Sequence, residues 1–518
     1  MNETGKQFTR AASSTSGRAK NQIPIISYQS KVVAIKPSLT KTDLPPSIQL
    51  RKAAFRCSAK KAMLLLFSVA VLLAEGLTAQ ETKLIASDGG VSDQFGKSVA
   101  ISGNTAIVGA NQATVGPNRQ GAAYIYIQSG GTWTLQQKIS AADGALGDNF
   151  GWSVDIQGDT AVVGARAAGN FGDGAVYVFT RTGTVWTMQQ KIIASDSTDL
   201  SWFGSAVAIS TNTIIVGSPG ADVMGTQGAS KGAAYIYTRS TNIWTEAQKI
   251  FASDFAASRR FGSSVAISGS TIVVGESPIS GAVLGAAYVF TSIGTTWTQQ
   301  QEITASDGTI GDGFSWSLAI NGDTAIIGAL SANNLGAAYV LTRSGTIWSE
   351  QQKLIPSDGA TNNGFGSSIS ISGNAAIIGA FAEGSAYIFM STGTNWTQQQ
   401  KLIPSDGATN GWPYDEFGNS VGISGITAIV GALLAGVGNN MNQGVAYIFQ
   451  PPSLSIGITD MTVVLSWPTN FAGFTLEVST NLNANFWSVV SPAPAVSGAN
   501  NVVTNANTGP TLFYRLHK

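Results

Sequence analysis

The sequence predicts an all-β protein, a seven-bladed β-propeller with four-stranded blades followed by a small β-sandwich-like module. A Phe-Gly motif or a close variant recurs seven times, with 51–58 residues between successive motifs. A repeat period near 50 residues is typical of propellers and solenoids. The chain also holds 60 glycines and only 11% charged residues, which favours short strands joined by tight turns. The motif phenylalanines are Phe95, Phe150, Phe203, Phe261, Phe314, Phe365 and Phe417.

Each repeat contains four strand-like segments. In the first repeat they cover residues 95–102, 105–109, 122–127 and 133–139. The first two are separated by Gly103-Asn104, a pair that suits a two-residue hairpin. Four short antiparallel strands per repeat make one propeller blade.

The fourth segment of six repeats opens with a tryptophan and then turns polar, usually as Gln-Gln-Lys. A polar strand at the outer edge of a blade discourages pairing with other molecules. The third segment carries a tyrosine in all seven repeats. We therefore expect the fourth strand to be the exposed outer edge of each blade.

The seventh repeat stops after its third segment, at Phe449. Residues 80–88 (QETKLIASD) resemble residues 398–406 (QQQKLIPSD), which begin within a fourth strand. The N-terminal segment is therefore predicted to complete the last blade and close the ring. This places the propeller at residues 80–450.

Residues 1–79 are predicted to be a basic leader with a signal peptide. Residues 63–74 form an apolar run that is short for a membrane span, and five basic residues between 51 and 61 precede it. Cleavage is expected after Ala79, which leaves no membrane span in the mature chain. The alternative is an uncleaved membrane anchor.

The charge distribution argues against some partners. Residues 80–518 hold 17 Lys or Arg and 26 Asp or Glu, a net charge of −9, so nucleic acid and anionic membranes are not expected partners. The only cysteine, Cys57, lies in the leader, and the only histidine is His517. Disulfides, thiol chemistry and His-based metal sites are therefore not expected in the propeller.

The repeats resemble the FG-GAP repeats of integrin α-chain propellers, and more closely those of bacterial secreted relatives. The matching residues are the Phe-Gly opening, the Val108-Gly109-Ala110 segment and the Gly-Ala-Ala-Tyr segment at 121–124. The resemblance covers about residues 80–450. It implies calcium loops between the first two strands, but those hairpins are short here and lack an Asp-x-Asp-x-Asp run, so no metal site or cofactor is expected.

Pro451-Pro452 ends the repeats. Six apolar segments within residues 451–518 read as five or six strands, and they predict a small β-sandwich-like module. This region is similar to fibronectin-type modules and to C-terminal modules of some environmental bacterial surface proteins. The resemblance implies an accessory or anchoring role.

Recurrent aspartates precede each Phe-Gly motif. One set contains Asp88, Asp143, Asp196, Asp254, Asp307, Asp358 and Asp406, and a second contains Asp93, Asp148, Asp199, Asp312 and Asp415. Cation binding or acid–base catalysis is one interpretation, and capping of turns by the carboxylates is the other. The repetition in every blade favours turn capping.

Aromatic and basic residues that break the repeat are the candidate ligand-binding residues. Trp202, Trp412 and Tyr414 precede their strands, where stacking on a sugar or contact with a protein competes with simple packing. Trp152 and Trp316 lie just inside a strand, which favours packing between blades. Arg259 and Arg260 replace the usual acidic position of their loop, and a solvated pair is the simpler interpretation.

The sequence favours a secreted or cell-surface binding or scaffold protein that recognises a protein or glycan through one propeller face. No catalytic residue is assigned. The alternatives are an extracellular hydrolase that uses carboxylates and a purely structural envelope component. Long connections between the second and third strands at residues 111–120, 218–231 and 432–443 predict that the binding face carries these loops.

Overall fold

The computed structural model describes residues 80–518, apart from 170–171, 197–199, 222–230, 254–259, 277–283, 360–363, 408–414, 451–453, 460–461, 469–474, 480–486, 492, 499, 507–512 and 518. The leader lies outside the described residues, so the signal peptide stays a prediction. In the part that is described, no helix is long and apolar enough to cross a membrane.

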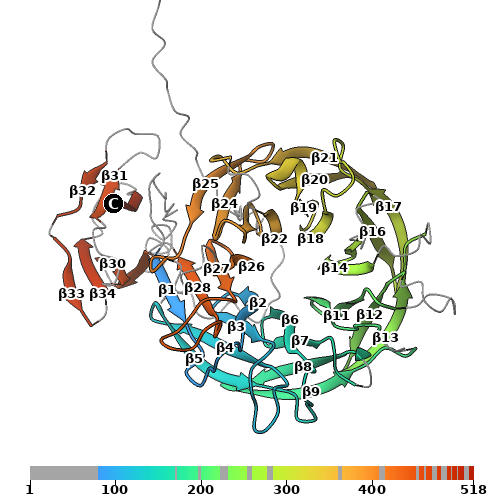
Figure 1. Cartoon of the computed structure of the whole chain (residues 1–518). Helices are drawn as coiled ribbons and strands as arrows, with labels where there is room; N and C mark the ends of the chain where they lie inside the picture. The colour runs from blue at the N-terminus through green and yellow to red at the C-terminus, as the bar shows by residue number, and fades with distance from the viewer. Residues whose placement is uncertain are drawn as a thin grey trace, which may run out of the picture. The chain divides into compact units, whose positions relative to one another are not determined.

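Seven four-stranded antiparallel sheets form the blades, which confirms the predicted fold class (Figure 1). In each sheet the strand that starts at or just after the Phe-Gly motif lies near the centre of the ring, and the strand at the other end of the sheet lies on the rim. From the centre outward, the strands are β2 (Phe95–Ser102), β3 (Thr105–Ala110), β4 (Ala122–Ser129) and β5 (Thr132–Ile139) in blade 1; β6 (Phe150–Gln157), β7 (Thr160–Ala165), β8 (Ala175–Thr182) and β9 (Val185–Ile192) in blade 2; β10 (Ala206–Ser210), β11 (Thr213–Ser218), β12 (Ala233–Ser240) and β13 (Ile243–Ile250) in blade 3; β14 (Phe261–Ser268), β15 (Thr271–Glu276), β16 (Ala286–Ile293) and β17 (Thr296–Ile303) in blade 4; β18 (Phe314–Asn321), β19 (Thr324–Ala329), β20 (Ala337–Ser344) and β21 (Ile347–Leu354) in blade 5; β22 (Phe365–Ser372), β23 (Ala375–Ala380), β24 (Ser385–Ser391) and β25 (Trp396–Leu402) in blade 6; and β26 (Phe417–Ser424), β27 (Thr427–Ala432), β28 (Val445–Gln450) and β1 (Gln80–Leu84) in blade 7.

Blade 7 is built from both ends of the propeller sequence. Strand β1 pairs antiparallel with β28, and Gln80 lies opposite Gln450 and Leu84 opposite Ala446. This is the pairing that the likeness between residues 80–88 and 398–406 predicts. The ring is thus closed by backbone hydrogen bonds inside one sheet.

The core lies between the blades. Side chains from each pair of neighbouring sheets form a buried cluster, and seven such clusters run around the ring. Val99 faces blade 7 and Ala100 faces blade 2, as expected from the alternation of side chains along a strand. In every blade the motif phenylalanine contacts the third-strand tyrosine, with ring centres 5.3–5.5 Å apart.

Polar side chains join neighbouring blades at the centre and at the rim. At the centre, Ser98 Oγ donates to the carbonyl of Gly151 at 2.9 Å. At the rim, the Gln137 amide both donates to the Trp186 carbonyl and accepts from its N–H, each at 2.8 Å. We name this arrangement an amide bridge. The predicted role of the polar outer strand was protection of an edge, and the structure adds a second role in holding the next blade.

The amide bridges link blades 1 through 6. They join Gln137 to Trp186, Gln190 to Trp244, Gln248 to Trp297, Gln301 to Trp348 and Gln352 to Trp396. Among the described residues, no amide bridge joins blade 7 to either neighbour.

The C-terminal strands form two further sheets. One has the order β29 (Ser455–Thr459), β30 (Thr462–Pro468), β34 (Asn500–Ala506) and β33 (Ala495–Ser497), and the other has the order β32 (Ser488–Val489), β31 (Thr475–Ser479) and β35 (Phe513–His517). Each of the six predicted segments contains a strand, and β33 is additional. Buried Leu465 and Trp467 belong to the first sheet, and buried Tyr514 and Leu516 to the second.

Candidate ligand-binding surface

Two sets of loops lie on the same face of the propeller, which we call the loop face. The loop that enters each blade bonds to the loop between the second and third strands of the preceding blade. Phe95 N donates to the Gln443 carbonyl and Phe150 N to the Gln120 carbonyl, both at 2.8 Å. The variable connections and the Phe-Gly segments therefore share a face, as expected.

The Phe-Gly motif is a tight turn at the start of each innermost strand. Lys97 N donates to the Gln94 carbonyl at 3.1 Å, and Gly96 has a φ of +90°. This combination is a type II turn with Phe and Gly at its two central positions. A Cβ on Gly96 would also lie 2.5 Å from the Val445 carbonyl oxygen of blade 7. The glycine thus permits both the turn and close contact with the preceding blade.

The residue before the motif phenylalanine has a φ between +53° and +68° in all seven blades. We call this residue and the one two positions after the phenylalanine the axial positions, because they flank the turns at the centre of the loop face. They are Gln94, Lys97, Asn149, Trp152, Trp202, Ser205, Arg260, Ser263, Gly313, Trp316, Gly364, Ser367, Glu416 and Asn419. None of these fourteen residues is aliphatic.

Cations and indole rings gather at part of this centre. The Arg166 guanidinium carbon lies 3.3 Å from the ring centre of Trp152, and Lys97 Nζ lies 4.4 Å from the same ring. The Arg260 guanidinium carbon lies 5.5 Å from the ring centre of Trp202. All three contacts are within cation–π range. We call Lys97, Trp152, Arg166, Trp202 and Arg260 the axial cluster.

The cations of the axial cluster repel one another in a partly dehydrated setting. Burial lowers the pKa of Lys97, and the positive charge of Arg166 lowers it further, while Glu416 acts in the opposite direction. Burial and the neighbouring Arg260 likewise lower the pKa of Arg166. Burial raises the pKa of Glu416, although Lys97 opposes that effect. The cluster therefore carries positive charge that its own surroundings stabilise poorly.

The structure describes the positions of two of the five candidate ligand-binding residues, and the role of all five in binding stays a prediction. It brings Trp202 and Arg260 together and makes them part of one cluster. Trp412, Tyr414 and Arg259 lie outside the described residues, so their roles stay predictions. Arg260 is stacked on an indole, which the interpretation as a solvated pair did not anticipate.

Trp152 and Trp316 differ from the packing interpretation. Trp152 is half-buried, but Lys97 and Arg166 lie against its ring. Trp316 is 51% exposed, so packing between blades is wrong for most of this side chain. Trp316 lies in a bulge, since the pairing of β18 with β19 skips from Phe314 to Leu318.

The first set of aspartates forms a joint that we call the tyrosine clasp. In blade 1, Tyr124 Oη donates to Asp88 Oδ1 at 3.0 Å, and Lys138 Nζ donates to Asp88 Oδ2 at 2.7 Å. The clasp fixes the loop that enters a blade to its third and fourth strands. The other described clasps join Asp143 to Tyr177 and Lys191, Asp196 to Tyr235 and Lys249, Asp307 to Tyr339 and Lys353, Asp358 to Tyr387 and Lys401, and Asp406 to Tyr447 and Lys83.

The clasp corrects the interpretation of the first aspartate set. These carboxylates bind side chains of the blade that follows, so backbone capping does not describe their main role. The second set does cap turns. Asp93, Asp148 and Asp312 accept from the N–H three residues earlier, at 2.7–2.8 Å. Among the described residues, no group of three acidic, His or Cys side chains is arranged to hold a metal ion.

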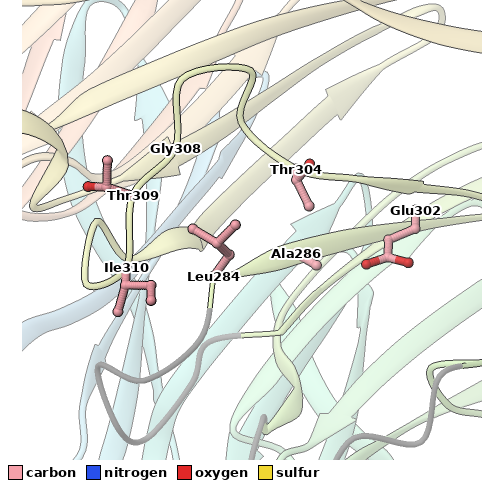
Figure 2. Close-up of a pocket in the computed structure, with 7 residues that line it drawn as sticks. All are labelled: Leu284, Ala286, Glu302, Thr304, Gly308, Thr309 and Ile310. Carbon is pink, nitrogen blue, oxygen red and sulfur yellow. The ribbon is translucent and has the colours of Figure 1, made fainter.

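Blade 4 departs from the clasp pattern. Glu302 pairs across from Tyr288, where blade 1 has Lys138 across from Tyr124. A pocket of about 520 Å³ adjoins this position (Figure 2). Figure 2 shows Leu284 and Ile310 on one side and the Glu302 carboxylate on the other. The described residues that line the pocket are Leu284, Ala286, Glu302, Thr304, Gly308, Thr309 and Ile310, and Glu302 is the one titratable group among them.

Three of these residues were missed at the sequence level: Lys97, Arg166 and Glu302. An alignment of the repeats by motif contains the signal. Arg166 is the only cation among the seven residues that follow the second strands, and Glu302 replaces a lysine that the other fourth strands keep. Which residues of other blades lie near these side chains could not be predicted from a single repeat.

Comparison with known proteins places the repeats in a family. The FG-GAP repeat matches residues 78–126, 133–179, 186–237, 244–290, 297–341, 348–389 and 396–449, and each match overlaps the strands of one blade and its neighbour. No curated protein matches the chain. A solved chain described as "Crystal Structure of Mitotic Checkpoint Complex" is similar at 10% identity with a TM-score of 0.45, and the match covers 74% of this chain and 97% of that one. On the strength of the seven matches, which cover more than half of its length, this chain belongs to the FG-GAP repeat family.

Proposed function

We propose that this protein is a non-enzymatic binding or scaffold protein, secreted or held at the cell surface, that recognises a protein or glycan ligand through its loop face. One observation carries the proposal. The side chains that differ between repeats, including the axial cluster, gather on the loop face, whereas short hairpins of similar sequence join the first two strands of each blade. Variable side chains on a rigid scaffold are where binding usually resides.

The hydrolase alternative finds less support in the described residues. Paired carboxylates that cleave glycosides must flank one bond. Six aspartates of the first set are engaged in tyrosine clasps, and one carboxylate, that of Glu302, is found among the described residues that line the pocket beside blade 4. We therefore propose binding without catalysis.

Point substitutions test the proposal better than loop shortening. The loop at residues 432–443 is tied to the loop that enters blade 1, because Gln443 Nε2 donates to the Ala86 carbonyl at 2.9 Å and Asn440 Nδ2 to the Gly89 carbonyl at 3.1 Å. Shortening it would damage the fold as well as the surface. Trp202→Ala and Trp316→Ala change the axial positions without removing these bonds.

The experiment is a screen of the purified protein against arrays of glycans and extracellular proteins. Any ligand found should bind the Trp202→Ala and Trp316→Ala variants at least about tenfold more weakly, because a stacked aromatic anchor is typically worth 2 kcal/mol or more. Ile426→Ala is the matched control, since Ile426 is 47% exposed in a hairpin turn of blade 7. Loss of binding with the control alone would mean that the binding face is the hairpin face. The absence of any ligand would favour a purely structural role.

Secretion has its own test. The full-length chain should be exported, and N-terminal sequencing of the exported protein should give Gln80 as its first residue. Retention of the leader in a membrane fraction would instead support the uncleaved anchor.

A further inference from the structure

We propose that the axial cluster is a binding site for a carboxylate carried on a sugar, so that the ligand is a glycan containing uronic acid residues. This inference rests on the proposed function in one respect, because it takes the loop face as the binding face. It adds the chemical class of the ligand and the residues that would recognise it.

The first argument is unmatched positive charge. Lys97, Arg166 and Arg260 form no ion pair with the residues that the structure describes. Glu416 acts on Lys97 electrostatically but is not within ion-pair distance, so it offsets only part of the charge. The Nε atom of Arg260 is buried without a hydrogen-bond partner in the same part of the chain. A buried guanidinium donor without a partner is costly, and a carboxylate is the group that matches its planar pair of donors.

The second argument is mutual repulsion. Lys97 and Arg166 lie against the same Trp152 ring, so their like charges are close together. The charge of Arg166 lowers the pKa of Lys97, and the charge of Arg260 lowers the pKa of Arg166. An anion between these cations removes the repulsion, so its binding is favoured by the charges that are already in place. Stacking on Trp152 and Trp202 also limits the movement of the two guanidinium groups, which reduces the entropy lost on binding.

The third argument concerns what carries the carboxylate. Apart from the charged Lys97, Arg260 and Glu416 and two glycines, the axial positions provide indoles, amides and hydroxyls and no aliphatic side chain. Such a set suits a ligand rich in hydroxyl groups better than a peptide, which would need apolar contacts. Trp316 of blade 5 follows Arg260 of blade 4 around the ring and is 51% exposed, so an indole is available beside the cationic sector.

The fourth argument is the charge of the surroundings. The net charge of residues 80–518 is −9, so the field away from the cluster opposes a dense polyanion. A chain with one carboxylate per sugar meets less repulsion than a heavily sulfated glycan or a nucleic acid. Salt screens the distant charges within about 8 Å at physiological ionic strength, so the contacts in the cluster decide the outcome.

The test is calorimetric titration of the protein with a short oligogalacturonide, its methyl ester and an oligoglutamate peptide. The oligogalacturonide should bind, and the methyl ester, which has the same sugar without the charge, should bind at least about tenfold more weakly, as loss of a charged hydrogen bond implies. Arg260→Gln and Arg166→Gln should each weaken oligogalacturonide binding about tenfold or more. Arg166→Lys keeps the charge but not the planar fork, and should give a smaller loss.

The matched control is Arg181→Gln. Arg181 also stacks on an indole, Trp186, at 5.2 Å, but it already pairs with Asp159 at 2.6 Å. Binding should be unchanged in this variant, and thermal melts should show that all four variants fold. The proposal would be overturned if the oligogalacturonide and its methyl ester bound equally well. It would also be overturned if Arg260→Gln and Arg166→Gln bound the oligogalacturonide as the parent does. Preferential binding of the oligoglutamate would overturn the assignment to glycans. A ligand that depends on Trp202 and Trp316 but not on the arginines would leave the proposed function standing and refute this inference.

Discussion

The Phe-Gly turn makes a quantitative prediction about contact between blades. Gly151 and Gly158 both have positive φ in blade 2, at +87° and +57°. A Cβ on Gly151 would lie 2.4 Å from the Ala122 carbonyl oxygen of blade 1, whereas a Cβ on Gly158 would have no heavy atom within 4 Å. Replacing either by alanine carries the backbone cost of about 1–2 kcal/mol, but only Gly151→Ala adds an overpacking cost of about 1–3 kcal/mol.

The assay is thermal and urea unfolding of Gly151→Ala, Gly158→Ala and the parent under identical conditions. Gly151→Ala should lose about 2–5 kcal/mol in total, clearly more than the control. Blade 5 provides a natural comparison, because Ser315 stands at the glycine position with a φ of +68° and its Oγ donates to the Glu276 carbonyl at 2.9 Å. If both alanine variants lose the same stability, then close approach of the blades does not explain the motif.

Three other predictions follow from closure, charge and metal content. Deleting residues 80–88 should lower the melting temperature strongly and cause aggregation, because β28 then has a bare edge; a variant that melts like the parent would mean that the ring closes by another route. Burial raises the pKa of Asp155 to about 6, so its contribution to stability is complete below its unfolded pKa near 3.8 and is lost as the pH rises through about 6. Asp155→Ser should flatten this part of the stability–pH curve and still accept from Ile209 N, as Ser370 accepts from Ile423 N at 3.1 Å in blade 6, and an unchanged slope would exclude Asp155 as its source. Removal of divalent cations with a chelator should leave the melting temperature unchanged, and a fall of many degrees would point first to the loop of Asp88 and Asp93.

The fold could be predicted from the sequence because the chain repeats. Strand order, blade number and the role of residues 80–88 all depend on local patterns that recur, and such patterns are strong when seven copies agree. The type II turn could also have been inferred, since a glycine at a fixed position after Phe suggests positive φ. The bulge that separates Phe95 from Ser98 in the pairing with β3 left no comparable signal.

The candidate site was harder to predict from the sequence, because residues of different blades form it. Arg166 follows β7, while Lys97 begins β2, and only the ring brings them to one indole. The clasp was missed for the same reason, since Asp88 and Lys138 are 50 residues apart and the lysine could be explained as part of a polar edge. Trp202 could be singled out from the sequence because it stands where the other repeats have a small, polar or charged residue, next to a motif whose place in the blade was already known.

The construction of blade 7 has a mechanical consequence. Gln80 begins β1 and Gln450 ends β28, and these two residues are paired. Tension applied across the two ends of the propeller would therefore peel this strand pair apart one residue at a time rather than shear it along its length. In the described residues the amide bridges clamp the rims of blades 1 to 6 but not those of blade 7. Blade 7 is joined to blade 1 through Gln450, whose Oε1 accepts from Gln128 Nε2 at 2.8 Å and from Trp133 Nε1 at 3.0 Å. We expect the β1–β28 pair to separate first under load, before the blades that the amide bridges join.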